Sequence, residues 1–380
     1  METRPTRVLV IDDSVVVRRL VSDVLSRQDG IEVVGTAPNG RIGLQKIPQL
    51  SPDLITLDVE MPEMDGIETL KAIRAAHGDL PVIMFSTLTE RGAAVTIDAL
   101  MHGANDYVTK PANVGSVEES MARVAADLTP RIHALCGRSR DVDRTGSRET
   151  GWRAAGSPTP STTSARSATS AIRPVGPPAR VDLVVIGVST GGPNALAELV
   201  PALPADLPVP VVIVQHMPAM FTRLLAERLD NTSAVAVREA AGGERIGPGE
   251  CWIAPGDHHL EVAGSSDGLR LRVHDGEKEN SCRPAVDVLF RSAVAATGRH
   301  TLGVVMTGMG RDGQRGAGDL VRAGARVVVQ DEASSVVWGM PGAVVGAGSA
   351  DEVLPLRRLA LEIASRVAVG RAALTGSVPR

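Results

Sequence analysis

Ser189 lies in a setting that is typical of a catalytic nucleophile. The apolar, β-branched run 181–188 predicts a buried parallel strand, and Gly187, Gly191 and Gly192 surround the serine. Glycines at these places permit a sharp turn that lifts the hydroxyl clear of the sheet. A serine hydroxyl is a good nucleophile at neutral pH only when a base takes its proton, so this setting predicts a histidine and an orienting carboxylate nearby.

His216 and Asp312 are the best-placed partners for this serine. His216 closes the strand-like run 210–215, and Asp312 follows another such run within a glycine-rich turn. The carboxyl ends of parallel strands share one edge, so we expect all three side chains to meet in one crevice. Four other histidines fall on a predicted hairpin or in polar segments and are expected at the surface: His258, His259, His274 and His300.

Two rival interpretations of the serine segment remain open. The Gly-x-Ser-x-Gly pattern at 187–191 is short and arises often by chance. A dinucleotide-binding loop also joins a strand to a helix, but Ser189 stands where that fingerprint needs its second glycine, and the next strand ends in His216 instead of a ribose-binding acid. The chain order Ser, His, Asp also differs from the Ser, Asp, His order of α/β-hydrolases.

A second group of residues suits phosphate chemistry. Asp12 and Asp13 end the first predicted strand, Asp58 ends the third, and Lys110 follows the fifth. They should converge at the carboxyl edge of one sheet. Crowded carboxylates repel each other, and a hard cation such as Mg²⁺ offsets that repulsion. A carboxylate beside a metal and a lysine can accept a phosphoryl group.

The order of elements predicts two doubly wound α/β domains. Strand-like and helical segments alternate over the first 125 residues and again after residue 180, and the segment 257–273 resembles a β-hairpin. The residues between are rich in Ser, Thr, Pro, Gly, Ala and Arg, which predicts a disordered linker. The predicted strands are 8–11, 32–34, 54–57, 82–85, 106–108, 181–188, 210–215, 250–254, 301–307 and 325–330.

Composition narrows the class of protein. The 380 residues exceed one ordinary core, and with 2% aromatics the cores must be aliphatic. A net charge of −4 gives no general attraction to nucleic acid or anionic lipid. No run reaches the ~18 apolar residues of a membrane span, so we expect a cytoplasmic protein that is not inserted in a membrane. The cysteines, Cys136, Cys251 and Cys282, lack metal-ligand spacing and suit free thiols.

The first half resembles the receiver domain of two-component response regulators. The resemblance rests on Asp12-Asp13, the segment 58–66, Ser86-Thr87 and Lys110-Pro111. It implies that Asp58 accepts a phosphoryl group from a chemotaxis histidine kinase. The implied roles of the remaining residues are Mg²⁺ binding by Asp13, Asp58 and the Glu60 carbonyl with help from Asp12, phosphoryl contact by Lys110, and switch positions at Ser86 and Tyr107.

The second half is similar to the protein-glutamate methylesterases of bacterial chemotaxis. The similarity rests on the segments 186–192, 215–218, 283–290, 307–313 and 339–341. It implies Ser189 as nucleophile, His216 as general base and then acid, and Asp312 as the orienting carboxylate, without a cofactor. It also implies that the amides of Thr190 and Met309 bind the oxyanion. The implied substrates are chemoreceptors, whose glutamate γ-methyl esters are hydrolysed to release methanol and whose glutamines are deamidated.

Two features depart from that family, and two other outputs remain as alternatives. Cys282 precedes the segment 283–287 where many members carry histidine, and the linker is longer than usual. A thiol nucleophile at Cys282 is disfavoured because the sequence pairs no base with it. The alternatives are a serine esterase acting on another ester, and a DNA-binding output, which needs a basic recognition helix that the pattern after residue 180 lacks.

The expected boundaries are 7–125 for the receiver domain, 126–180 for a helix end and linker, 181–370 for the catalytic domain and 371–380 for a flexible tail. The unphosphorylated receiver is expected to cover the esterase crevice, and phosphorylation of Asp58 to favour an open arrangement. The long linker is compatible with docking, because doubling a flexible linker costs only about 0.6 kcal/mol in closure entropy.

Overall fold

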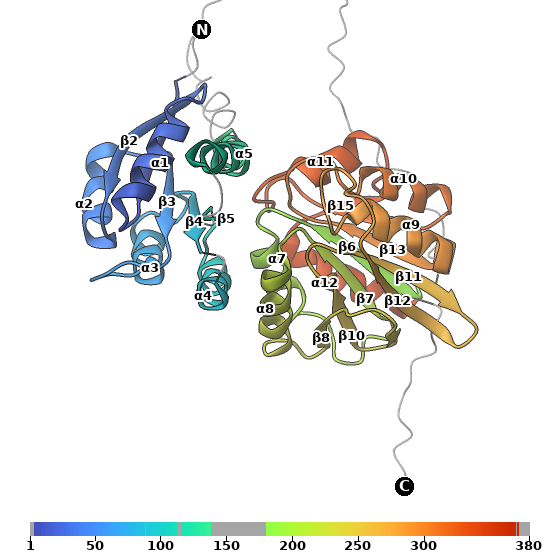
Figure 1. The fold of residues 1–380 in the computed structure, drawn as a ribbon. Coiled ribbons are helices and arrows are strands. Elements are labelled where there is room, and N and C mark those ends of the chain that lie inside the picture. The colour runs from blue at the N-terminus through green and yellow to red at the C-terminus, as the bar shows by residue number, and fades with distance from the viewer. Residues whose placement is uncertain (1–3, 88, 112–115, 138–179, 370, 372–380) are drawn as a thin grey trace, which may run out of the picture.

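The chain folds into two α/β domains (Figure 1), and the computed structural model describes residues 4–87, 89–111, 116–137, 180–369 and 371. Residues 138–179 of the predicted helix end and linker, 126–180, and residues 372–380 of the predicted tail, 371–380, lie outside the described residues. Within the described part of the chain, no helix combines the length and apolar character needed to cross a bilayer.

The first domain is built on a five-stranded parallel sheet with the order β2-β1-β3-β4-β5. Its strands are β1 (Thr6–Ile11), β2 (Ile31–Ala37), β3 (Leu54–Asp58), β4 (Val82–Ser86) and β5 (Asp106–Thr109). Its helices are α1 (Val15–Leu25), α2 (Gly40–Leu50), α3 (Gly66–Ala76), α4 (Glu90–Met101) and α5 (Val117–Cys136). This is the doubly wound sheet that the alternating pattern predicts.

Local signals explain why these elements begin where they do. β3 and β4 are buried at every position, as expected for central strands of a parallel sheet. Asp65 and Ser116 each begin a helix with a capping box, closed by Glu68 and Glu119. Helix α5 continues to Cys136, well past residue 125, because its apolar face packs into the receiver core.

The second domain is built on a seven-stranded parallel sheet with the order β15-β14-β13-β6-β7-β10-β8. Its strands are β6 (Leu183–Val188), β7 (Val211–Gln215), β8 (Ala236–Glu239), β10 (Glu250–Ile253), β13 (Thr301–Val305), β14 (Arg326–Gln330) and β15 (Glu352–Leu354). Its helices are α7 (Gly192–Leu199), α8 (Ala219–Asp230), α9 (Val286–Thr297), α10 (Gln314–Arg322), α11 (Gly339–Gly346) and α12 (Leu356–Ala368), with a 3₁₀ turn, η1, at Gly298–His300.

A small antiparallel sheet completes this domain. The predicted hairpin is confirmed, because β11 (His259–Ser265) pairs with β12 (Gly268–His274) and β9 (Arg245–Ile246) pairs with β12. The sequence pattern gave no signal for β8, β9 or β15. These strands have two to four residues, and β8 and β15 are the edges of the large sheet, where half-exposed polar positions break the apolar run.

Candidate active site and acidic pocket

The acidic pocket of the first domain assembles as expected at the carboxyl edge of its sheet. The Lys110 Nζ lies 2.9 Å from Asp12 Oδ2 and 2.8 Å from Asp58 Oδ1. Asp12 and Asp58 are buried, whereas Asp13 is exposed at the mouth of the pocket. One oxygen from each of the three aspartates lies within 4.8 Å of the others. Three carboxylates and one lysine leave the pocket with an excess of negative charge.

Burial sets the protonation of the pocket. It raises the pKa of Asp58 to about 6, and the nearby charge of Asp12 adds to this effect while Lys110 opposes it. Burial likewise raises the pKa of Asp12. Within the described part of the chain, the Asp58 Oδ2 atom is buried without a hydrogen-bond partner. An unpartnered carboxylate oxygen in a cluster of three carboxylates fits a hard divalent cation.

The two predicted switch residues contact different parts of the molecule. The Ser86 hydroxyl accepts a 2.6 Å hydrogen bond from Thr96 Oγ1 and therefore faces α4. The Tyr107 ring stacks on Phe221 of α8, with 4.6 Å between the ring centroids. Tyr107 thus links β5 of the receiver directly to the second domain.

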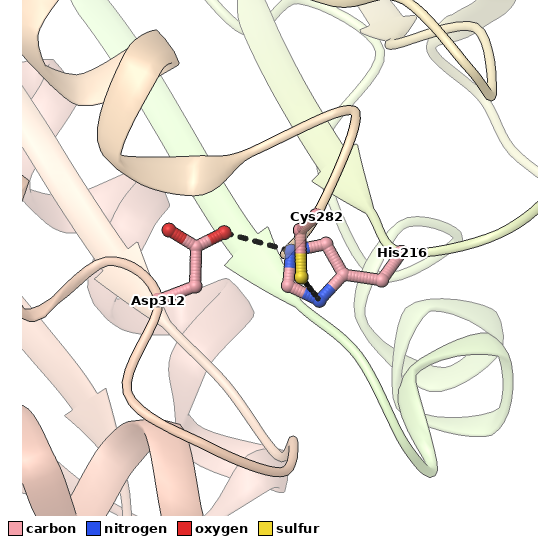
Figure 2. A group of neighbouring side chains, drawn as sticks. All are labelled: His216, Cys282 and Asp312. Atoms are coloured by element: carbon pink, nitrogen blue, oxygen red, sulfur yellow. Dashed lines mark hydrogen bonds and ion pairs between the residues drawn. The ribbon is translucent and has the colours of Figure 1, made fainter. Parts of the chain in front are cut away.

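His216 and Asp312 meet in the second domain, as Figure 2 shows. The His216 Nε2 lies 2.8 Å from Asp312 Oδ2, and Asp312 is only 2% exposed. The Asp312 carboxylate also accepts hydrogen bonds from Asn280 Nδ2 and from the backbone amides of Val286, Asp287 and Gly313. These donors fix the carboxylate and, through it, the orientation of the imidazole ring.

The histidine and the carboxylate have pKa values displaced in opposite directions. Burial disfavours the charged imidazolium, but hydrogen bonds to Asp312 and Cys282 outweigh it and raise the pKa of His216 to about 10. Burial disfavours the charged carboxylate of Asp312, yet the bond to His216 and the backbone amides hold its pKa below the ordinary value. The pair therefore favours an imidazolium beside an ionised carboxylate.

Ser189 lies at the same edge of the sheet, on the strand next to that of His216. Ser189 directly follows β6, and its backbone amide donates a hydrogen bond to Thr307 O. The backbone amide of His216 donates a hydrogen bond to Val188 O at 3.2 Å. The turn needs glycine at 191, where φ is +75° and a Cβ would lie 2.5 Å from Val336. Among the described residues the Ser189 hydroxyl has no hydrogen bond to His216, so the structure joins His216 to Asp312 but does not join Ser189 to His216.

Cys282 lies against the imidazole ring of His216, close to the nitrogen that Asp312 does not contact (Figure 2). Its Sγ lies 3.8 Å from His216 Nδ1 and 3.4 Å from Asn280 O. The thiol therefore does have a base beside it in the folded protein, which the sequence did not predict because 66 residues separate the two. Asn280 and Ser281 have positive φ values of 51° and 64°, which turn the loop toward the histidine. The sequence pattern did not predict this turn.

His259 corrects another expectation, because it is buried and not at the surface. Its Nδ1 accepts a hydrogen bond from the Ala285 amide, and its Nε2 lies 2.8 Å from Glu277 O. It thus supports the start of α9, whose first amides hold Asp312. The other three histidines expected at the surface keep part of their area exposed: His258, His274 and His300.

The two amides named for the oxyanion have no hydrogen-bond acceptor among the residues that the structure describes. They belong to Thr190, directly after the serine, and to Met309, in the loop after β13. The Thr190 hydroxyl donates to Asp106 Oδ2 of the receiver at 3.1 Å. The segment that carries the serine is therefore tied to the first domain.

The receiver forms one wall of the crevice that holds His216. A cavity of about 260 Å³ is lined on one side by Tyr107 and Arg131 and on the other by His216, Cys282 and additional residues of the second domain. Helix α4 faces α7 and α8 across the interface (Figure 1). Besides the bond from Thr190 to Asp106, polar contacts across it include Asn194 Nδ2 to Ala104 O at 2.9 Å, Arg223 to Glu90 at 2.7 Å and Arg228 to Asp98 at 3.8 Å.

Comparison with known proteins matches each half of the chain to a protein family. The family model described as CheB methylesterase matches residues 184–363, and the response regulator receiver domain model matches residues 8–122. A protein named protein-glutamate methylesterase/protein-glutamine glutaminase from Nocardioides sp. is 55% identical over 371 residues, which are 97% of each chain. A protein of the same name from Trichodesmium erythraeum is 50% identical over 95% of this chain and 99% of its own. The crystal structure of the Thermotoga maritima CheB methylesterase catalytic domain is 41% identical, with a TM-score of 0.48, over 49% of this chain and 99% of that chain.

Proposed function

The chain belongs to the family of protein-glutamate methylesterases/protein-glutamine glutaminases that carry a receiver domain, and from this premise we propose which residues perform and control the reaction. It is a methylesterase and glutaminase of chemotactic adaptation. Its proposed substrates are the glutamate γ-methyl esters and certain glutamines of cytoplasmic chemoreceptor segments. The proposed phosphodonor is a chemotaxis histidine kinase, and the proposed location of the protein is the cytoplasm.

The reaction begins with attack of the Ser189 hydroxyl on the ester carbonyl. Asp312 occupies His216 Nε2, so Nδ1 is the ring nitrogen left to take the serine proton. The amides of Thr190 and Met309 stabilise the oxyanion, and His216 returns the proton as methanol leaves. A water then hydrolyses the acyl-enzyme by the same route. The 2.8 Å contact between His216 and Asp312, at the edge where β6 presents the serine, carries this assignment.

Before this cycle can start, His216 must lose the proton that Asp312 and Cys282 stabilise. Neutral imidazole is the active base, and its fraction grows as the pH rises toward a pKa of about 10. We therefore expect kcat/KM of the unphosphorylated chain to rise about tenfold per pH unit above pH 7, until the pKa is reached. The measurement is methanol release against pH, corrected with a Ser189→Ala sample for spontaneous ester hydrolysis.

The matched variant for this profile is Asp312→Asn. Removing the carboxylate takes away a major cause of the raised pKa, so the midpoint of the residual activity should move toward the ordinary value of 6.5. A flat profile for the parent chain, or identical midpoints for the two proteins, would contradict this role of Asp312.

Control of the esterase starts at Asp58, which we assign as the phospho-acceptor. Mg²⁺ bound by Asp13, Asp58 and the Glu60 carbonyl, with help from Asp12, would neutralise charge on the incoming phosphoryl group. Lys110 lies 2.8 Å from Asp58 and is placed to contact that group. Phosphorylation gives the nearby Ser86 hydroxyl a new acceptor, and Tyr107 carries the change to α8 through its stacking on Phe221.

Mg²⁺ should raise the melting temperature of the receiver domain. Binding to the folded state alone stabilises it by about 2.7 kcal/mol at a concentration of 100 times Kd, which corresponds to a shift of several degrees. The measurement is thermal unfolding with and without Mg²⁺. An unchanged shift in the Asp58→Asn variant would contradict the assigned site.

The Asp58→Asn variant offers a second check. Burial raises the pKa of Asp58 from 3.8 to about 6, so the folded state favours the protonated carboxyl. The free energy of unfolding therefore falls as the pH rises through this range and the carboxylate ionises. Without Mg²⁺ at pH 7 the variant should therefore melt above the parent, and at pH 3 this advantage should vanish.

The docked receiver is proposed to hold the esterase in a restrained state. The receiver forms one wall of the cavity beside His216. Its Asp106 also accepts a hydrogen bond from the hydroxyl of Thr190, the residue next to the proposed nucleophile. Phosphorylation of Asp58 would shift the population toward an undocked form that receptors can enter. Methanol release from methylated receptor membranes, with and without acetyl phosphate, tests the function and its control together.

A further inference from the structure

The Cys282 thiol and the His216 Nδ1 are two metal-ligating atoms in contact with each other. The Cys282 Sγ and the His216 Nδ1 are 3.8 Å apart, and Asp312 contacts the other ring nitrogen, Nε2 (Figure 2). A ligand oxygen, nitrogen or sulfur from each of these residues lies within 4.8 Å of the others. We propose that this pair is an inhibitory binding site for a borderline-soft divalent metal such as Zn²⁺, which removes the catalytic base by capturing its free nitrogen.

The distance between the two ligand atoms fits this class of metal. Zn–S bonds of about 2.3 Å and Zn–N bonds of about 2.05 Å at a tetrahedral angle place sulfur and nitrogen about 3.6 Å apart. The observed separation of 3.8 Å is close to that spacing, and binding also requires the Cys282 loop to carry the sulfur toward the ring plane, in which the Nδ1 lone pair points. Sulfur and imidazole select Zn²⁺ over Mg²⁺, which takes oxygen ligands and suits the acidic pocket of the receiver instead.

Asp312 acts here as a partner of the ligand and not as a ligand. Its oxygens already accept hydrogen bonds from His216, Asn280 and three backbone amides. A carboxylate that receives one ring N–H of a histidine fixes the tautomer and directs the other nitrogen at a metal. The bond that prepares His216 to act as a base therefore also prepares Nδ1 to bind zinc.

The cavity gives a metal access to both atoms. His216 and Cys282 line the cavity of about 260 Å³ between the domains, so water can complete the coordination. Its other charged lining residues carry both signs: Asp127, Arg131, Asp257, Lys278 and Arg283. Binding forms the Zn–S and Zn–N bonds and releases the thiol proton of Cys282, together with the Nδ1 proton where His216 is an imidazolium, to solvent.

The inhibition rests on the proposed function, because one nitrogen cannot hold zinc and accept the proton of Ser189 at once. The metal binding itself does not rest on that function. Two separate readouts on the full chain therefore distinguish failure of the one from failure of the other. Both are made with excess Mg²⁺, which occupies the acidic pocket, and with a phosphine reductant that keeps the thiols reduced.

The first readout is a titration with Co²⁺. The parent chain should develop a near-ultraviolet thiolate-to-cobalt charge-transfer band that Zn²⁺ displaces. The band should be absent from Cys282→Ser and from His216→Ala, and retained in the matched control Cys136→Ser, which changes a buried thiol of the receiver. A parent without the band, or a band that survives Cys282→Ser, overturns the proposed site whatever the enzyme does.

The second readout is methanol release during a Zn²⁺ titration, expressed for each protein relative to its own zinc-free rate. The parent should lose at least tenfold when the cobalt band is fully displaced, and a chelator should restore the rate. Cys282→Ser should keep most of its own rate at the same Zn²⁺ concentration. Equal inhibition of the parent and Cys282→Ser overturns the inhibitory role.

Discussion

The Ser189→Ala variant should lose nearly all methanol release from methylated receptor membranes. The residual rate should be that supplied by substrate binding and the oxyanion amides, and the loss in kcat should be on the order of 10⁶-fold. The physical reason is that the neighbouring hydroxyl, that of Thr190, donates to Asp106 and so does not replace the Ser189 hydroxyl beside the His216–Asp312 pair. The measurement is methanol release with the acetyl phosphate-treated chain.

Phosphorylation of Asp58 provides the control for folding, since Ser189→Ala leaves the acidic pocket untouched. A variant that is phosphorylated normally but still releases methanol would remove Ser189 from the mechanism. The Cys282 thiol, 3.8 Å from His216 Nδ1, would then be the alternative nucleophile. A double variant with Cys282→Ala would decide this, because it alone should abolish the remaining rate.

A chain that begins at Arg180 should be active without any phosphodonor. Removing the receiver removes the wall of the cavity beside His216 and the contact of Asp106 with Thr190. Coupling between sites is commonly worth 1–3 kcal/mol, so we expect a rate about 5- to 150-fold above that of the unphosphorylated full chain. The measurement compares the two proteins at equal concentration, with circular dichroism confirming that the shorter chain is folded.

The same claim can be tested in the intact chain by reversing a charge in the interface. Arg223→Glu turns the contact with Glu90 into a repulsion, and combining it with Glu90→Arg restores the attraction. The single variant should raise the unphosphorylated rate a few-fold, since exposed ion pairs contribute little, and the double variant should lower it again. Equal rates for the full chain and the receiver-free chain would contradict restraint by docking.

Much of the fold follows from the sequence because both sheets are parallel and doubly covered. Their central strands are continuous apolar runs, such as β6 and β7, and these stand out in any pattern. The same topology places strand ends together, which is why Asp12, Asp58 and Lys110 were expected to meet. The edge strands β8 and β15 lack that signal.

The parts of the site that could not be predicted depend on loop conformation and on the domain interface. Cys282 reaches His216 only because two residues before it adopt positive φ. Tyr107 and Phe221 stack across the interface between the two domains. The identity of one residue gives no information about which residue of the other domain it will contact. Such contacts leave no periodicity in the sequence, because they are made by single side chains at the ends of elements.

The most direct test of the central claim is methanol release from methylated receptor membranes by the full chain, measured with and without acetyl phosphate. Phosphorylation of Asp58 is expected to increase the rate, and Asp58→Asn is expected to keep the low rate under both conditions. Methanol release that is absent in both conditions, or that is the same for the parent and the Asp58→Asn variant with acetyl phosphate, would contradict a methylesterase gated at Asp58.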